Sequence, residues 1–291
     1  MTVSKFEYYG PSTIEETCDL LEKMGEGAMV MAGGTDLLVK ISRMLVAPKV
    51  VIGLKKIEGL NRISFGPVKG LSIGATALLA DVAAHPKIKK NYPALAAAAE
   101  ETANVQVRNM GTVVGNLCNG APSAENAPAL IALGGQVVIM SSKGTRHLPL
   151  DDFFKGPGIT AIEPGEIVTA VTVPPPPAKS GASYRHISAR GKVDISAVCV
   201  GVMVTMDGQT CKEARIALGA VAPIPMRAVE AENMLMGNRV SKELIKKAGL
   251  KAREESKPIS DMRASAEYRK KMVAVLTERA LTEAYERALK G

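Results

Sequence analysis

The sequence has no tryptophan and few other aromatic residues, with 6 tyrosines and 4 phenylalanines among 291 residues. It also lacks a long uncharged apolar run. The longest nearly uncharged apolar stretch, 127–140, is interrupted by Pro128 and Gln136 and is too short to cross a bilayer. The first ten residues contain Glu7 and no apolar block, so no secretory signal is expected. We therefore expect a cytoplasmic protein without a membrane span.

Residues that commonly bind metals are scarce and scattered. The 4 cysteines are separated by 100, 81 and 12 residues, no C-x-x-C pair occurs, and there are 3 histidines. Structural zinc sites and iron–sulfur clusters need clustered thiolates or imidazoles, so we predict no metal site. A disulfide framework is not expected in an intracellular chain of this size. The sequence also has no obvious catalytic triad or carboxylate pair, so we assign no catalytic residue, and any chemistry must use an organic cofactor or side chains alone.

The formal net charge of +8 is concentrated at the C-terminal end, where residues 241–291 carry 13 Lys or Arg against 8 Asp or Glu. A basic nucleic-acid-binding module is one interpretation. However, the charges of opposite sign are interleaved, and only two tyrosines are available there to stack on bases. The pattern favours a solvated, salt-bridged helical face, with a docking face for an acidic partner protein, built on Arg269, Lys270 and Lys271, as the alternative. We expect no nucleic-acid partner.

The composition is that of a folded globular chain, because 46% of the residues are apolar and 23% are charged. It excludes disorder, collagen and a coiled coil, and the length suits two ordinary domains. The clearest boundary is the proline run 174–177, which follows an alternating segment, 167–173, typical of a strand. Strands and helices alternate before this run, whereas strands come first and helices last after it. The sequence predicts two α+β domains, 1–176 and 177–291.

The periodicity of apolar residues places the individual elements. Ser12 and Glu15 form a capping-box pattern at the start of the first helix, and Asp207-Gly208 is a hairpin signal. The predicted helices are 13–24, 79–84, 93–103, 127–133, 228–236, 242–257 and 265–290. The predicted strands are 28–31, 50–52, 137–140, 167–173, 182–190, 195–206 and 212–218.

Two segments rich in glycine and small polar residues stand out, 32–38 (AGGTDLL) and 111–126 (GTVVGNLCNGAPSAEN). Glycine lets the main chain approach a ligand closely, and consecutive N–H groups at a strand-to-helix turn form a site for anions. Such a surface suits a pyrophosphate or ribityl chain without needing Lys or Arg. The second segment has little regular pattern, and long irregular loops in compact domains are usually functional. Neither segment matches the Rossmann or P-loop motif.

Simpler interpretations of both segments exist. A Gly-Gly pair after a strand is often only a turn, and Asp36 is better suited to cap a helix than to contact a phosphate. Cys118, inside the second segment, is interpreted as a small buried packing residue, with a position near the ligand as the alternative. The residues alone therefore indicate a nucleotide-like ligand held by two backbone loops.

The two segments in this order resemble the FAD-binding subunit of the molybdenum hydroxylases, the xanthine dehydrogenase and carbon monoxide dehydrogenase family. The resemblance extends over nearly the whole chain, including VQVRN at 105–109, GEIV at 165–168 and the spacing of Tyr184, Arg190 and Asp194. One family branch has a cysteine-rich insert for an extra iron–sulfur cluster, and this chain lacks it.

The resemblance implies a two-part FAD-binding domain of the PCMH, or vanillyl-alcohol-oxidase-like, type with halves of about 1–55 and 56–176. FAD is expected between these halves, and a smaller α+β domain with an antiparallel sheet and terminal helices is expected to follow. The family usually has Asp where Glu125 stands and often Lys where His186 stands. The expected FAD-binding residues are Ala32, Gly33, Gly34, Thr35, Asp36, Leu37, Gly111, Thr112, Val114, Gly115, Asn116, Asn119, Ser123, Glu125, Val168 and His186.

The resemblance also implies an oxidoreductase subunit that transfers electrons. In the family, a large molybdopterin-binding subunit oxidises the substrate, and a small subunit with two-iron two-sulfur clusters passes single electrons to FAD. FAD then delivers them to NAD+, a quinone or another acceptor. The alternative is a stand-alone FAD-dependent oxidoreductase, which would need a base over the flavin that the sequence does not reveal.

Overall fold

The structure is a computed structural model that describes residues 5–191 and 194–290. The predicted outer bounds at residues 1 and 291 lie outside the described residues. The helices are α1 (Ile14–Met24), the short 3-10 helix η1 (Gly25–Gly27), α2 (Leu37–Ser42), α3 (Leu79–Ala84), α4 (Pro86–Asn91), α5 (Pro93–Glu101), α6 (Val105–Arg108), α7 (Val113–Cys118), α8 (Asn126–Ala132), α9 (Leu150–Phe153), α10 (Val229–Leu235), α11 (Lys242–Glu255) and α12 (Ala266–Lys290). The strands are β1 (Glu7–Tyr9), β2 (Ala28–Met31), β3 (Val50–Gly53), β4 (Ile63–Gly66), β5 (Gly70–Gly74), β6 (Gln136–Ser141), β7 (Gly144–Pro149), β8 (Phe154–Gly156), β9 (Ile159–Thr160), β10 (Ile167–Val173), β11 (Ser180–Ser188), β12 (Ser196–Asp207), β13 (Thr210–Gly219) and β14 (Met226–Arg227). Each helix and strand predicted from periodicity is confirmed, with ends shifted by a few residues.

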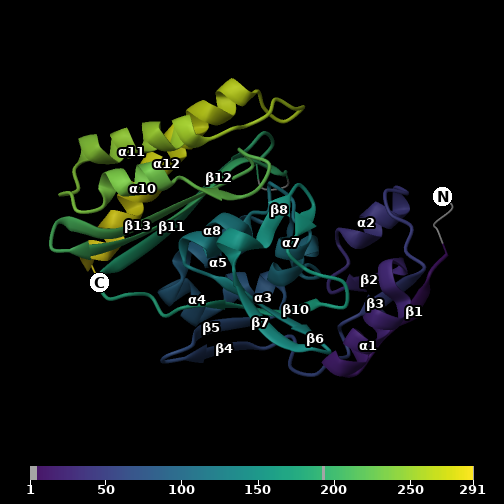
Figure 1. Cartoon of the computed structure of the whole chain (residues 1–291). Helices are drawn as coiled ribbons and strands as arrows, with labels where there is room; N and C mark the ends of the chain where they lie inside the picture. The colour runs from purple at the N-terminus through teal and green to yellow at the C-terminus, as the bar shows by residue number, and fades with distance from the viewer. Residues whose placement is uncertain (1–4, 192–193, 291) are drawn as a thin grey trace.

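A small parallel sheet forms the N-terminal lobe, with strand order β1-β3-β2 (Figure 1). Successive parallel strands need crossover connections, and α1 lies in the connection between the two outer strands, β1 and β2. The apolar face of α1 packs through Cys18 and Leu21 on Val50 and Ile52. These contacts bury one side of a sheet that is otherwise too small to form a core alone.

The start of α1 differs from the prediction by one residue. Thr13, not Ser12, is the N-cap, and its Oγ1 accepts a hydrogen bond of 3.1 Å from the Glu16 N–H. Glu16 Oε2 in turn accepts from the Ser12 N–H at 2.8 Å. The capping box therefore uses Thr13 and Glu16, because Ile14 is already helical and the preceding extended residue must take the cap position.

The second lobe contains a five-stranded antiparallel sheet in the order β4-β5-β10-β6-β7. Helices α3, α5 and α8 lie between this sheet and the last sheet of the chain (Figure 1). The alanine-rich α5 buries Ala94, Ala98 and Ala99 completely, and small side chains let it approach both α3 and β11. This helical layer holds the largest hydrophobic core cluster.

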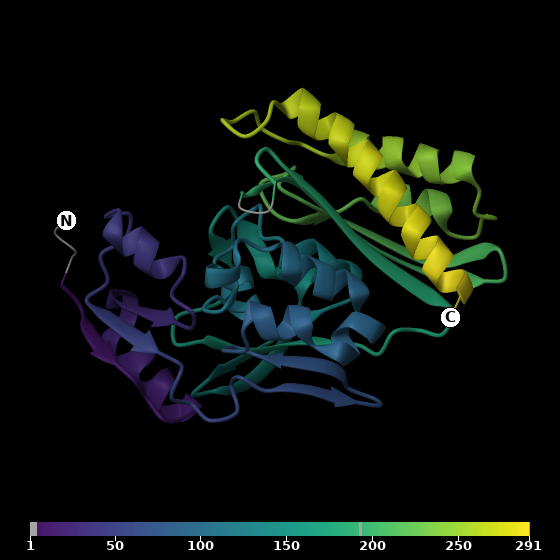
Figure 2. The ribbon, with the colours of Figure 1, turned by 180° about the vertical axis from the view of Figure 1, so that it is seen from behind.

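The C-terminal part is a four-stranded antiparallel sheet, β11-β12-β13-β14, whose outer face is covered by α10, α11 and α12 (Figure 2). Its inner face packs on α5 and α8. At Gly201 of β12 a Cβ would lie only 2.7 Å from the Ala129 backbone nitrogen, so glycine allows the sheet to touch α8 directly. The predicted α+β architecture is confirmed.

Arg269 does not belong to an exposed basic face, contrary to the docking interpretation. It is 3% exposed, and its Nη1 donates to the carbonyl oxygens of Ala197 (2.6 Å) and Ala220 (2.9 Å). Its Nη2 donates to Asp261 Oδ1 at 2.7 Å. Position 269 lies on the inward stripe of α12, so this guanidinium fixes the helix to the sheet, whereas Lys271 is exposed.

Every helix among the described residues is too short or too polar to traverse a bilayer. Over the same residues, no three His, Cys, Asp or Glu side chains gather in a way that would hold a metal ion.

Candidate functional site

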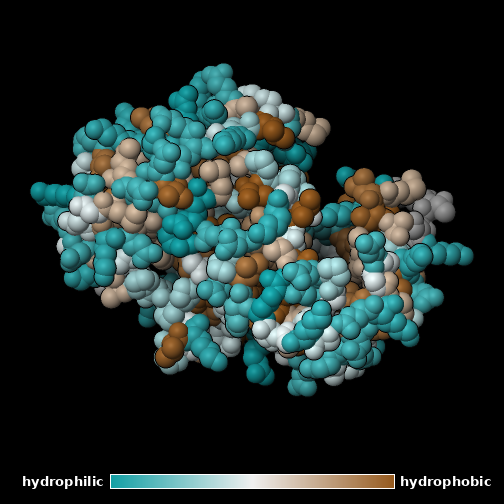
Figure 3. Space-filling view, in the orientation of Figure 1, coloured by the Kyte–Doolittle hydropathy of each residue, from teal (hydrophilic) through white to brown (hydrophobic). Residues whose placement is uncertain are grey.

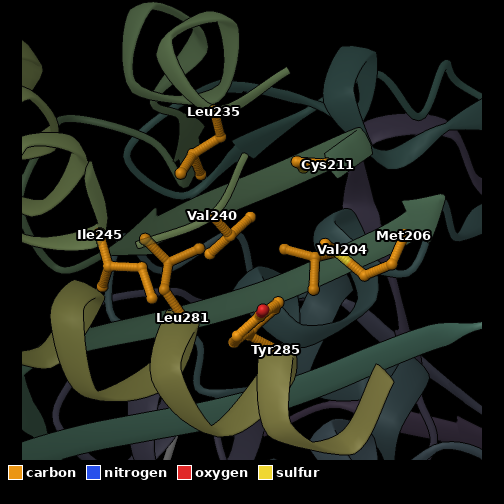
Figure 4. Close-up of a pocket in the computed structure, with 8 residues that line it drawn as sticks. All are labelled: Val204, Met206, Cys211, Leu235, Val240, Ile245, Leu281 and Tyr285. Carbon is orange, nitrogen blue, oxygen red and sulfur yellow. The ribbon is translucent and has the colours of Figure 1, made fainter. Parts of the chain in front are cut away.

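A cavity of about 890 Å³ opens between the N-terminal lobe and the helical layer. The space-filling view shows the molecule hollowed between the lobe that carries α2 and the rest of the chain (Figure 3). Cavities of this size accommodate large cofactors. A second cavity, inside the C-terminal part, has a volume of about 10 Å³ and mostly apolar walls, such as Val204, Val240 and Leu281 (Figure 4). It is a packing defect with room for little more than one water molecule.

The turn between β2 and α2 forms the first wall of the large cavity. Within the described part of the chain, the backbone N–H groups of Gly33, Gly34 and Thr35 donate to no protein acceptor. Gly34 has a φ of +76°, in the left-handed region that favours glycine. Three consecutive free N–H groups beside an open space form a site for an anion.

Gly33 also connects this wall to the opposite one. A Cβ at Gly33 would overlap the carbonyl oxygen of Met110 and lie 2.8 Å from Gly111 Cα. Glycine is therefore required for the two segments to meet.

The second segment forms the opposite wall but is more regular than predicted. Residues 113–118 form α7, which begins at Thr112, whose Oγ1 accepts from the Gly115 N–H at 2.9 Å. A Cβ at Gly115 would approach only this hydroxyl, at 2.8 Å, so the rest of its surroundings is open. The prediction that 111–126 is a long irregular loop is wrong, because Thr112 caps a short helix inside this glycine-rich segment.

Asn116 is held at a fixed orientation at the end of this wall. Its Oδ1 accepts from the Asn126 side-chain amide at 3.1 Å and from the Asn126 N–H at 3.4 Å. Asn126 Nδ2 also donates to Thr102 Oγ1 at 3.1 Å. With its oxygen occupied, Asn116 presents its amide N–H groups as donors for a ligand, and no acceptor for them lies in the described residues.

Lys40 is a cavity residue that the sequence analysis missed. Its Nζ donates to Asn119 Oδ1 at 2.6 Å, which connects α2 to the far wall. The backbone loops were expected to suit an anion without Lys or Arg, and the structure adds one lysine to the same cavity. The sequence contained one indication that Lys40 belongs to the site: it follows Asp36 by four residues, and residues i and i+4 of a helix lie on one face.

Asp36 stands at the N-cap position of α2, but its side chain makes no capping hydrogen bond. The predicted cap function is therefore wrong. Its carboxyl lines the cavity, where partial burial raises its pKa and the nearby Lys40 opposes this effect.

Two further strips of the cavity wall come from distant parts of the sequence. One is the segment 162–168 leading into β10, of which only Val168 was predicted. The other is Asp194 with Ile195, just before β12. Both were missed because only the folded chain places them near the glycine segments. Leu54, Leu79 and Val107 add apolar surface that can pack against a planar ring system.

The structure brings fifteen of the sixteen expected residues to this cavity, and His186 is the exception. Glu125 reaches the cavity although it is only 8% exposed, and this burial raises its pKa. Its Oε1 accepts from Ser196 Oγ at 3.4 Å. His186 lies behind this pair, with Nδ1 at 3.2 Å from Ser196 Oγ and Nε2 at 3.2 Å from Glu101 Oε2.

Cys118 is half-buried and lines the cavity, so the interpretation as a plain packing residue is incomplete. Burial raises the pKa of its thiol to about 12. The protonated thiol is a weak nucleophile, and Cys118 contributes a surface rather than a reactive group.

Comparison with known proteins finds two adjoining family models. Residues 4–176 match the FAD binding domain in molybdopterin dehydrogenase, and residues 182–284 match the CO dehydrogenase flavoprotein C-terminal domain. The carbon monoxide dehydrogenase medium chain of Afipia carboxidovorans is 33% identical over 288 residues, covering 99% of each chain. The nicotine 6-hydroxylase medium subunit of Paenarthrobacter nicotinovorans is also 33% identical, covering 98% of this chain and 99% of the relative.

Solved structures show the same similarity in three dimensions. A chain of carbon monoxide dehydrogenase from Hydrogenophaga pseudoflava superposes with a TM-score of 0.94 at 32% identity, covering 99% of both chains. A chain of quinoline 2-oxidoreductase from Pseudomonas putida 86 gives 0.92 at 30% identity, covering 99% of this chain and 100% of that one.

Proposed function

The chain belongs to the family of FAD-binding subunits of molybdopterin dehydrogenases, and from that premise we propose that it passes electrons between a partner's iron–sulfur clusters and an external acceptor. The predicted family, FAD cofactor and oxidoreductase class are confirmed by these matches. In the proposal, a large molybdopterin-binding subunit oxidises the organic substrate, and a small subunit with two-iron two-sulfur clusters delivers single electrons to FAD. The acceptor is NAD+, a quinone or another oxidant.

The observation that carries this proposal is the row of three unpaired N–H groups, Gly33 to Thr35, in the wall of the 890 Å³ cavity. A dinucleotide pyrophosphate is an anion that needs several donors in a small volume. Lys40 is the cation nearest to these groups along the chain and lines the same cavity. The amide of Asn116 and the apolar side chains of Leu54 and Leu79 provide complementary surfaces for the sugar chain and the rings.

We therefore assign FAD to this cavity, between the halves 1–55 and 56–176 of a domain ending near residue 176. Glycine loops of both halves hold the pyrophosphate, and Glu125 faces the ribityl or ribose portion. His186 acts from behind Glu125 instead of touching the cofactor. The proposed contacts are Ala32, Gly33, Gly34, Thr35, Asp36, Leu37, Gly111, Thr112, Val114, Gly115, Asn116, Asn119, Ser123, Glu125 and Val168, with Lys40 added.

FAD supplies the redox chemistry, because it exchanges electrons singly with metal clusters and in pairs with organic acceptors. The residues of this chain bind and orient it, and the apolar walls exclude water from its rings. The family relatives are termed medium chains or subunits, which denotes parts of larger assemblies, and we extend this organisation to the present chain. Its four free cysteines suit a reducing compartment, and we propose a cytoplasmic location.

Two measurements test the proposal. The purified chain, titrated with FAD, should bind one equivalent with the absorbance changes of a protein-bound flavin. The tagged chain, purified from its own host, should carry along two further subunits with molybdenum and iron in stoichiometric amounts. A chain that binds FAD but purifies without either metal would support the stand-alone oxidoreductase instead.

A further inference from the structure

A line of hydrogen-bonded side chains runs from the wall of the large cavity to the protein surface. It begins at Glu125, which precedes α8, and continues through Ser196 of β12 to His186 of β11. It ends at Glu101, the last residue of α5. The successive distances between heavy atoms are 3.4, 3.2 and 3.2 Å.

The two members on the cavity side are buried, and the two outer members are partly exposed. Glu125 is 8% exposed and Ser196 is 1% exposed, whereas the side chains of His186 and Glu101 are 17% and 29% exposed. The inner end faces the cavity and the outer end reaches solvent. His186 and Ser196 come from the paired strands β11 and β12, whereas Glu101 and Glu125 come from the helical layer, so the arrangement depends on the packing of the C-terminal sheet against that layer.

We propose that Glu101, His186, Ser196 and Glu125 form a proton path that delivers protons from solvent to the cofactor cavity. This inference rests on the proposed function. Iron–sulfur clusters deliver electrons without protons, while reduction of a flavin takes up protons as well as electrons. The protons therefore come from a source other than the clusters, and this line provides a route that does not pass through the mouth of the cavity.

Each member can accept and release a proton. A proton from solvent binds the Glu101 carboxylate and passes to His186 Nε2. The Nδ1 proton of His186 moves to Ser196 Oγ as the Ser196 hydroxyl proton moves to Glu125 Oε1. The net result is one proton on the Glu125 carboxyl, and no electron is transferred. Glu101 and Ser196 end in their starting protonation states. His186 ends as the other neutral tautomer and returns to the first by exchanging its ring proton.

Other acidic groups of the cavity are less suited to this function. Glu166 is held by Arg146 through hydrogen bonds of 2.6 and 2.7 Å, and Asp194 pairs with Arg190. Asp36 is accessible from the cavity itself. Among the described cavity residues, Glu125 is the buried carboxyl with a hydrogen-bonded route leading away from the cavity.

The groups around the line keep its inner end neutral. The titratable groups that interact with Glu125 are Asp36, which lines the cavity, and the buried Tyr184 and Cys199. Burial raises the pKa of both Tyr184 and Cys199, so these two stay protonated. Tyr184 also stacks on the His186 ring, with centroids 6.2 Å apart and planes inclined by 16°, which limits rotation of the imidazole. The raised pKa of Glu125 favours its protonated form, as a proton donor requires.

The first test measures proton uptake directly. The full chain, loaded with FAD, is mixed anaerobically with reduced methyl viologen, a one-electron reductant that carries no proton. A pH-indicator dye reports proton uptake while absorbance reports flavin reduction. His186→Gln and Ser196→Ala should each slow proton uptake by at least about tenfold, with a larger solvent deuterium isotope effect. Added imidazole should partly restore the rate in His186→Gln.

Glu100→Gln is the matched control, since Glu100 neighbours Glu101 on α5 but is exposed. It should leave proton uptake unchanged. Unaltered proton uptake and isotope effect in both line variants would overturn the path. Loss of FAD from both variants would also overturn it, because the cluster would then serve to hold the cofactor.

A second test needs no cofactor and separates this inference from the proposed function. In the chain without FAD, NMR of ¹³C-labelled glutamate follows the titration of Glu125. Ionisable groups that interact through a short hydrogen-bonded line have coupled titrations, so removing the imidazole in His186→Gln should shift the Glu125 midpoint. An unchanged midpoint would refute the path even if FAD binds, whereas a chain that shows the shift but binds no FAD would refute only the proposed function.

Discussion

The carbonyl oxygen of Met110 fills the place that a side chain at Gly33 would occupy. This contact joins the two glycine segments, although they lie far apart in the sequence. It sets the width of the cavity between the N-terminal lobe and the helical layer, because neither backbone can move toward the other. The main reason for glycine at position 33 is therefore the close approach of two protein segments, and the approach of a ligand is a second reason.

Replacing Gly33 with alanine is expected to weaken FAD binding and folding together. The added Cβ forces the Met110 backbone away, and overpacking of this kind costs about 1–3 kcal/mol. Urea unfolding of the apo chain and calorimetric titration with FAD measure the two effects. Gly66→Ala is the control, because the nearest atom to a Cβ at Gly66 is 3.6 Å away and this residue lies outside the cavity wall. Equal FAD affinity in both variants would contradict the assigned width of the site.

Lys40→Met should weaken FAD binding without unfolding the chain. Methionine keeps the length of the side chain but removes the charge that faces the proposed pyrophosphate. Hydrogen bonds to charged groups contribute about 1.5–3 kcal/mol, so the dissociation constant should rise roughly 10- to 100-fold. The effect should shrink at high salt. Lys90→Met, at an exposed position of α4, is the control and should bind FAD normally in the same calorimetric experiment.

The glycine segments and Lys40 show what the sequence could reveal about the site. Gly33, Gly34 and Gly115 were predictable, because their chemistry is local: a turn, a positive φ and a short helix start. Asp194 and Glu166 were not, because they join the cavity only through tertiary packing. The position of His186 one layer behind Glu125 depends on how two strands pair, and no local pattern encodes that register.

The fold was predictable to a similar degree. Alternating and helical periodicities identified the main elements, since each must bury one face. The cap of α1 was misplaced by one residue because Ser12 and Thr13 are chemically alike and the difference lies in backbone geometry. Arg269 was misassigned because its charge suggested solvent, whereas its position on α12 faces the sheet. Buried arginines with several carbonyl acceptors are rare, and sequence composition favours the surface.

Arg269→Met is expected to destabilise the fold strongly while leaving FAD contacts untouched. The substitution leaves the carbonyl oxygens of Ala197 and Ala220 without their donor and removes one of the two arginines that pair with Asp261. Leaving a buried acceptor without its donor costs about 1–3 kcal/mol, and two acceptors are affected here. Chemical denaturation should show this loss, and Lys271→Glu, which changes an exposed residue of the same helix, should show little. If Arg269→Met lowers the free energy of unfolding by less than Lys271→Glu does, Arg269 does not hold α12 on the sheet.

Low pH should weaken the ion pair between Arg269 and Asp261. Burial tends to raise the pKa of Asp261, but the Arg263 N–H, the Arg269 guanidinium and the Ala264 N–H outweigh it and lower the pKa to about 2. A carboxyl with a lowered pKa in the folded state stabilises the fold above its unfolded pKa of about 3.9. That contribution is lost as pH falls from about 4 toward 2. Asp261→Asn should therefore flatten the pH dependence of the unfolding free energy in this range, and an identical slope in both proteins would exclude Asp261 as a contributor.

The chain loaded with FAD is expected to oxidise no organic substrate by itself. In the proposed function, the substrate reacts at the molybdopterin of another subunit, and electrons reach this FAD only through the partner's clusters. NADH is a separate case, since hydride transfer needs only a nicotinamide stacked on an accessible flavin face, and weak NADH-to-dye activity is expected. Anaerobic mixing with purines, nicotinate, aldehydes or carbon monoxide should leave the flavin absorbance unchanged, whereas dithionite should bleach it. Bleaching by one of these substrates in the absence of other subunits would show that the cavity receives substrate directly, and the stand-alone oxidoreductase would then replace the electron-transfer subunit as the assignment.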